Sequence, residues 1–466
     1  MSLAAISLAA LILTLVVSCV SSLNVGFLAI VLAWIVGVYL GGMRVDDVVA
    51  GFPAGLFLTL AGVTLLFSQA QTNGTLDRFA QRAVRACRGN AMAIPMMFFV
   101  LTAALSSIGP GNIASTALMA PMGMAVAGRY GISPFLMAIM IANGGSAGSL
   151  SPIAPTGIIV NGITTKIGLP NVQWTIYLNN LIAHTAVAFS GYFLLGGWRL
   201  FARAARAAAP AAGAPAPVGS PARHARGTRN AAAGLGAPRW GGPAAGTLPD
   251  RVSSSPTFSA GADAVDDPFE TRHWLTTLII ASLIIGVIFF GLNVGMGAFA
   301  GAAILTLLHA ADESEAVRRM PWKVIMMVTG ITVLISILEK TGGMGLFTDF
   351  LARLATPATS TAVTAFFTGL VSIYSSTTGV VLPAFLPTVP GLIQRMGGGD
   401  AMALVSSMNT GGHLVDVSPL STLGALCLAA APPGTDNRAL FNQLMAWGLS
   451  MTVVGALVCW VFFGLL

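Results

Sequence analysis

The chain has 466 residues, of which 55% are hydrophobic and 8% are charged, whereas a soluble domain carries about 25% charged residues. This composition excludes an ordinary soluble protein and, with a mean hydropathy of +0.82, predicts a polytopic helical membrane protein. The net charge is +7, and the Lys and Arg residues cluster between apolar segments instead of along one face, which excludes a nucleic-acid-binding protein. The four cysteines form no CxxC pair, so neither zinc nor redox chemistry is predicted.

A membrane-spanning helix needs roughly 20 apolar residues. The chain contains apolar segments of two kinds. Eight are plain spans: residues 3–20, 25–40, 52–70, 175–195, 275–292, 295–308, 324–338 and 441–463. Four others, residues 91–127, 134–163, 361–396 and 401–431, are apolar but interrupted by Gly, Pro, Ser, Thr and Asn. Such interruptions occur at membrane depth only where they are buried in protein or line a cavity.

The chain matches itself at an offset of 267 to 269 residues, which predicts an internal repeat. At 269, Asn24-Val25-Gly26 matches Asn293-Val294-Gly295 and Ser106-Ser107 matches Ser375-Ser376. At 267, Gly144-Gly145 matches Gly411-Gly412 and Ser151-Pro152 matches Ser418-Pro419. We therefore predict two copies of one module, residues 1–198 and 272–466.

Residues 199–271, between the two copies, are dominated by Ala, Pro, Gly, Ser and Arg and contain almost no large apolar side chains. Such a segment cannot bury a core, which predicts a disordered linker. We expect it to be a solvated cytoplasmic loop; binding of its arginines to anionic lipid is the alternative.

The topology follows from counting the crossings. If each interrupted hairpin enters and leaves the membrane on one side, each copy crosses five times, and an odd number inverts the second copy. With the linker in the cytoplasm, 18 of the 23 Lys and Arg residues lie inside and 5 lie outside, as the positive-inside rule requires. The predicted fold is an all-α polytopic membrane protein with two inverted repeats of five transmembrane helices, each with a re-entrant hairpin and a broken helix. Both termini are predicted to lie outside.

The interruptions carry the chemistry. Polar residues occupy two hairpin tips, residues 106–116 and 375–379, and two helix breaks, residues 143–157 and 409–422. Inverted repeats with broken helices are typical of secondary transporters, whose sites lie where the breaks meet. Unwound carbonyls and Ser, Thr or Asn oxygens can coordinate Na⁺, while the amino ends of the following half-helices favour a carboxylate.

Two ionisable residues stand in the second break. Asp416 is an acid in an apolar segment, an expensive placement that indicates a pathway or coupling role. His413 is a candidate proton carrier or substrate partner, whereas His184 in the last span of the first copy is interpreted as a packing residue. The tip serines and threonines have a structural alternative, since small polar residues also allow helices to pack closely.

At these residues the sequence resembles the ion transporter superfamily, and within it the malonate or dicarboxylate carriers of the MatC type. The resemblance is best over residues 51–162 and 322–432. The related divalent-anion/sodium symporters carry Ser-Asn-Thr at their hairpin tips, where this chain has Gly111-Asn112-Ile113 and Ser376-Thr377-Thr378. These departures, together with Asp416, leave either Na⁺ or a proton as the coupling ion. The resemblance also implies a homodimer with a scaffold part and an elevator-like transport part.

By this resemblance, the tips and breaks hold the substrate and the coupling cation. The residues expected to bind substrate are Ser107, Asn112, Thr156, Ser376, Thr377, Thr378, Ser421 and Thr422. Those expected to couple the cation, with Na⁺ as the candidate metal, are Ser106, Asn112, Ser146, Ser151, Ser375, Asp416 and Ser418. No other cofactor and no catalytic residue is predicted.

The sequence thus predicts a carrier in the bacterial-type inner membrane that imports a small C3 or C4 dicarboxylate such as malonate, driven by Na⁺ or H⁺. The alternative in the same class is the membrane subunit of a binding-protein-dependent carboxylate system. The alternative of another class is an integral membrane enzyme or a channel. Residues 144–148 fit the GxSxG pattern of serine hydrolases, but the strand and the Asp and His partners that this motif needs are not predicted.

Overall fold

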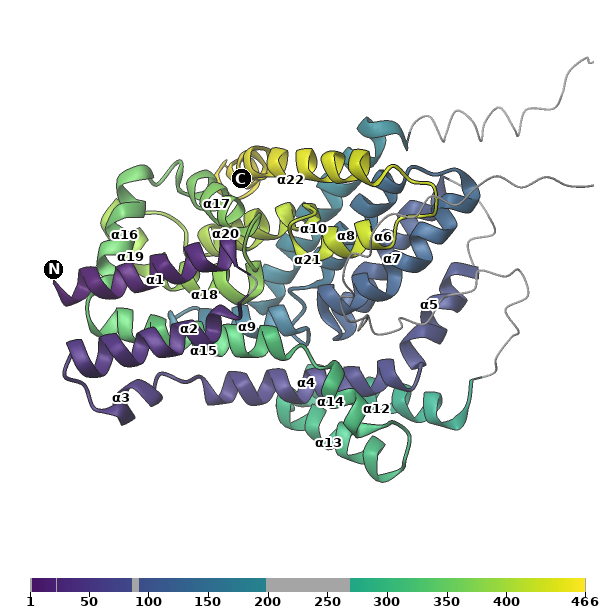
Figure 1. Cartoon of the computed structure of the whole chain (residues 1–466), viewed down its shortest axis with the longest axis horizontal. Coiled ribbons are helices and arrows are strands. Elements are labelled where there is room, and N and C mark those ends of the chain that lie inside the picture. The colour runs from purple at the N-terminus through teal and green to yellow at the C-terminus, as the bar shows by residue number, and fades with distance from the viewer. Residues whose placement is uncertain (1, 22, 86–91, 198–268, 466) are drawn as a thin grey trace, which may run out of the picture.

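The computed structural model describes residues 2–21, 23–85, 92–197 and 269–465, and these residues form helices and connecting turns without a β-strand (Figure 1). Among them, six helices are long and apolar enough to cross a membrane, and several shorter apolar helices accompany them. The prediction of an all-α, multi-pass membrane protein is confirmed.

Two sets of helices lie on either side of the predicted linker, which falls outside the described residues up to residue 268. The first set is α1 (Leu3–Val20), α2 (Val25–Trp34), α3 (Val45–Val49), α4 (Ala54–Thr72), α5 (Thr75–Arg85), α6 (Ala93–Ile108), α7 (Gly111–Tyr130), α8 (Pro134–Gly148), α9 (Pro155–Lys166) and α10 (Gln173–Tyr192). The second set is α12 (Thr271–Phe290), α13 (Val294–Leu307), α14 (Glu313–Arg319), α15 (Trp322–Lys340), α16 (Gly343–Leu354), α17 (Ser360–Ser372), η3 (Thr377–Val381), α18 (Leu382–Phe385), α19 (Val389–Met396), α20 (Ala401–Leu414), α21 (Thr422–Ala429) and α22 (Asn437–Cys459).

Both sets follow one order of elements. Each begins with two apolar helices and a short helix, continues with a 19-residue helix (α4 or α15) and a further short helix, and then forms a hairpin. The hairpins are α6 with α7, and α17 with the helical segment from η3 to α19. A helix interrupted near its middle follows in each set, α8–α9 and α20–α21, before the last long helix.

The two sets pack into each other reciprocally, because α2 lies against α15 and α13 lies against α4. The first contact brings backbones together. A Cβ atom added at Gly26 would overlap the carbonyl oxygen of Met326, and one added at Gly330 would overlap the carbonyl oxygen of Gly26. Small residues permit this approach, as is common where membrane helices cross.

A Gly26→Ala substitution is expected to destabilise the protein by about 1–3 kcal/mol, because the added methyl group meets backbone that cannot rotate away. The measurement is the thermal unfolding midpoint of the purified protein in detergent. Gly55→Ala is the matched control, since no atom lies within 4 Å of its added Cβ. Equal unfolding midpoints for the two variants would show that the α2–α15 contact accommodates the added methyl group without a loss of stability.

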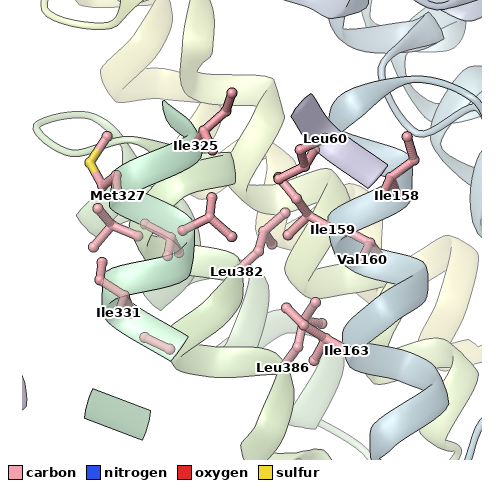
Figure 2. Close-up of a cluster of buried hydrophobic side chains, with 14 of the residues drawn as sticks. Leu60, Ile158, Ile159, Val160, Ile163, Ile325, Met327, Ile331, Leu382 and Leu386 are labelled. Atoms are coloured by element: carbon pink, nitrogen blue, oxygen red, sulfur yellow. The ribbon is translucent and has the colours of Figure 1, made fainter. Parts of the chain in front are cut away.

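An apolar interface joins α4 and α15 to the helical segments that follow the first break and the second hairpin tip. Figure 2 shows aliphatic side chains of α9 directed toward α4 and α18, with those of α15 beside them. The contributing residues are Leu60, Ile158, Ile159, Val160, Ile163, Ile325, Met327, Ile331, Leu382 and Leu386, all of them buried. Their burial removes apolar surface from water, which stabilises the interface.

Charged side chains gather near the two ends of α4. Before its first residue, Arg44 pairs with Asp47 at 3.2 Å and Lys340 Nζ donates to the Asp47 carbonyl oxygen at 2.6 Å. The hydrogen bond from Arg44 lowers the pKa of Asp47 below its ordinary value. Near the other end, where α5 begins, Arg272 pairs with Glu270 at 2.7 Å, and His273 Nε2 donates to the carbonyl oxygen of Asn73, the residue after α4. Figure 1 shows α3 and α5 at opposite ends of α4.

Candidate functional site

Both hairpin tips and both helix breaks meet at one cavity of about 330 Å³. Four helical segments begin at its wall: α7, α9, η3 and α21 contribute Asn112, Thr156, Thr377 and Thr422 from their first turns. The amino end of a helix presents unpaired N–H groups and a partial positive charge. Four such ends around one cavity create a place suited to an anion.

The first tip is formed by Gly109 and Pro110 between α6 and α7. Gly109 has φ 148° and Gly111 has φ 78°, values that an L side chain rarely adopts. Pro110 has no N–H to donate and precedes the first residue of α7, a position that proline tolerates at a helix start. These three residues reverse the chain while directing the start of α7 to the cavity.

The second tip is built from hydroxyl groups instead of glycines. Ser376 Oγ accepts the Gly379 N–H at 3.0 Å and caps the start of η3. Ser375 Oγ lies 2.8 Å from Ser18 Oγ of α1. The hydroxyl groups of Thr378 and Thr156 are 3.1 Å apart, so the second tip and the first break are joined directly.

The two breaks interrupt their helices in different ways. In the first, α8 ends at Gly148, six residues follow, and Pro155 opens α9, while the Gly157 N–H donates to the Ser149 carbonyl oxygen at 3.1 Å. In the second, α20 ends at Leu414, a 3₁₀ turn covers Val415–Val417, and Ser421 precedes α21. Both breaks place the start of a new helix at the cavity.

Asp416 contributes the one carboxylate among the described residues that line this cavity, and Arg319 contributes the one guanidinium. Asp416 is only 5% exposed. Its Oδ1 accepts hydrogen bonds from Thr377 Oγ1 at 2.8 Å and from Ser421 Oγ at 3.2 Å. The acid therefore joins the second tip to the second break and lines the cavity.

Most of the predicted site residues line this cavity. They are Asn112, Thr156, Ser375, Ser376, Thr377, Thr378, Asp416, Ser421 and Thr422. They come from all four interrupted segments, as predicted from the positions of the Gly, Pro, Ser and Thr clusters.

The other predicted residues do not line it. Ser106 Oγ donates to the Gly145 carbonyl oxygen at 2.7 Å, and Ser107 Oγ lies 2.9 Å from the Tyr177 hydroxyl. Both therefore fasten α6 to neighbouring helices. Ser418 Oγ accepts from the Leu420 N–H at 3.3 Å within its own turn. Ser146 and Ser151 are buried but lie outside the lining of the cavity.

Sequence reasoning missed the contribution of Arg319, which it counted only among the positive charges on the linker side. It also missed Thr64, Ser68 and Gln71 of α4, which line the same cavity. The available signal was their spacing: these three residues lie four and three positions apart in an otherwise apolar span, so they share one face of the helix.

A second cavity of about 530 Å³ lies between α4, α9 and α15 and contains none of the predicted site residues. Its wall includes Ala50 and Gly51, which correspond to Arg319 at repeat offsets of 269 and 268. Lys166 and Glu339 also line it, and the charge of Lys166 acts on the Glu339 carboxyl group. Each cavity thus lies beside the loop that precedes one of the two 19-residue helices, and each is lined by residues of both sets of helices.

The two histidines considered from sequence are fully buried and lie outside the cavity lining. His413 Nδ1 donates to the Asn409 carbonyl oxygen at 2.8 Å, which places its proton on Nδ1. His184 Nδ1 lies 3.1 Å from Asn143 Oδ1. For His184 this agrees with a packing role.

Comparison with known families gives one match. Residues 1–149 match the family model for the N-terminus of the dicarboxylate carrier protein MatC. This confirms the resemblance to MatC-type dicarboxylate carriers and supports a carrier. The matched part of the chain runs from α1 to the end of α8 and includes the first hairpin tip. Among curated proteins, none matches the chain.

Proposed function

We propose that this chain is a secondary active transporter that imports a small C3 or C4 dicarboxylate, such as malonate, together with Na⁺ or H⁺. The observation that carries the proposal is the convergence of four helix starts on one polar cavity inside a chain of membrane-length apolar helices. Such helix starts stabilise carboxylates, and the MatC match favours a transporter of dicarboxylates over an enzyme.

The proposed architecture is a pair of inverted repeats in the inner membrane, with the linker inside and both termini outside. It is supported by the shared order of elements and by the reciprocal packing of α2 on α15 and of α13 on α4. The distribution of positive charge supports the same orientation. A homodimer with a scaffold part and a moving transport part is proposed from the family resemblance.

The proposed roles divide the cavity between substrate and cation. Hydroxyl groups of Thr156 and Thr378, with N–H groups at the starts of α7 and α21, bind the substrate carboxylate. Asp416 compensates the charge of the coupling cation, or carries the proton itself, since an anionic substrate and an ionised Asp416 repel each other in one cavity unless a cation accompanies them.

The test is uptake of radiolabelled malonate, succinate and malate into proteoliposomes of the purified protein, with an imposed Na⁺ or proton gradient. We expect accumulation of at least one dicarboxylate above its external concentration under one of the two gradients. Absence of uptake for all three under both gradients would contradict a stand-alone carrier and direct attention to a separately encoded binding protein.

A further inference from the structure

Arg319 is the only basic residue that lines the cavity among the described residues. It is the last residue of α14, which packs on α4, so it lines the part of the cavity formed by these two helices. The side chain is 47% exposed, and its Nε donates to Glu315 Oε1 at 2.8 Å. A guanidinium group has five N–H donors, and this bond engages one of them.

Two carboxylates already interact with the guanidinium, one through a hydrogen bond and one through charge alone. Glu315 forms the exposed pair just described, and exposed pairs contribute little to stability, so this one can exchange for another carboxylate. Asp77 of α5 acts on Arg319 only through its charge. Burial raises the pKa of Asp77 and the charge of Arg319 opposes that rise.

The repeat does not explain an arginine at this position. The corresponding residues of the first copy, Ala50 and Gly51, line the second cavity and carry no charge. The backbone turn before the 19-residue helix therefore forms without a cation. The turn before α15 therefore does not require Arg319. Because Arg319 lines a cavity at which four helical segments begin, its guanidinium group is available to bind a ligand.

We propose that Arg319 binds the second carboxylate of the substrate and thereby selects dicarboxylates over monocarboxylates. The inference rests on the proposed function, in which the first carboxylate lies at the helix starts. A guanidinium group pairs with a carboxylate through two parallel hydrogen bonds, which gives it more selectivity than a hydroxyl group has. Neutral donors at the tips and breaks bind one carboxylate group of a monocarboxylate or of a dicarboxylate. Arg319 forms its hydrogen bonds only when the substrate has a second carboxylate group.

The experiment compares two probes that differ by one charge: malonate and its monomethyl ester. Equilibrium binding of each to the purified full-length protein is measured for the wild type, for Arg319→Gln and for Arg318→Gln. Arg318 is the matched control because it is the neighbouring exposed arginine of the same helix and does not line the cavity. Arg319 is itself substantially exposed, so its substitution is expected to leave the fold intact.

The expected result is that Arg319→Gln weakens malonate binding by about tenfold to 100-fold, as loss of hydrogen bonds between charged groups does, and weakens binding of the monoester much less. Arg318→Gln retains wild-type affinity for both. Unchanged malonate affinity in Arg319→Gln, or an equal loss for both probes, overturns the inference while the carrier proposal stands. If the wild type binds neither probe and its proteoliposomes take up none of malonate, succinate and malate, the proposed function itself fails.

Discussion

An Asp416→Asn variant is expected to lose concentrative dicarboxylate uptake by at least about 100-fold. The amide oxygen of asparagine still accepts the hydrogen bonds from Thr377 and Ser421, so the junction between tip and break is kept. What disappears is the negative charge. A charge pair at about 4 Å is worth about 4 kcal/mol at an effective dielectric constant of about 20, enough to set the affinity for a coupling cation or to hold a proton.

The measurement is initial uptake of labelled malonate under a Na⁺ gradient and under a proton gradient. Asp400→Asn is the matched control, because Asp400 caps the start of α20, the helix that precedes the turn with Asp416, and lies outside the cavity. Asparagine caps a helix about as well as aspartate does. Undiminished accumulation by Asp416→Asn would assign Asp416 a structural role and move the cation to the hydroxyl and carbonyl oxygens of the tips.

The second large effect is expected at the contact between Thr156 and Thr378. These hydroxyl groups join the two repeats at 3.1 Å and face the cavity. Thr→Val keeps the shape of the side chain and removes the hydroxyl group. Since a hydrogen bond to a charged group is worth about 1.5–3 kcal/mol, each single variant is expected to bind malonate about tenfold or more weakly.

The double variant decides whether the two hydroxyl groups act together. Because they contact each other, the loss in Thr156→Val/Thr378→Val is expected to differ from the sum of the single losses. Thr165→Val provides the control, since Thr165 lies on α9 like Thr156. Thr165 is exposed, and its hydroxyl group donates to the Asn161 carbonyl oxygen. Wild-type affinity in both single variants would exclude these threonines from the substrate site.

The cavity residues that sequence predicted best are those at chain interruptions. Glycines and prolines that break an apolar helix, such as Gly109 to Gly111, specify a tip from local chemistry alone. The structure brings residues of the tips and of the helix starts together at one cavity, with Asn112 and Thr422 as examples.

The predictions that missed the cavity involve helix faces and tertiary packing. Ser106 and Ser107 stand beside the first tip in sequence, but they belong to the last turn of α6 and face α8 and α10. Composition cannot determine that direction, because both faces of α6 contain small or polar residues. The position of Arg319 at the cavity could not be predicted for a different reason, because it depends on how the seven-residue α14 packs against α4.

The apolar interface of Figure 2 has a mechanical consequence. Its aliphatic and thioether side chains make contacts that lack direction, so displacing α9 and α18 along α4 and α15 replaces one set of dispersion contacts by a similar set. The α2–α15 crossing, by contrast, interlocks backbone with backbone at Gly26 and Gly330. We therefore expect helices to move relative to one another along this apolar interface, while α2 and α15 move together as one unit.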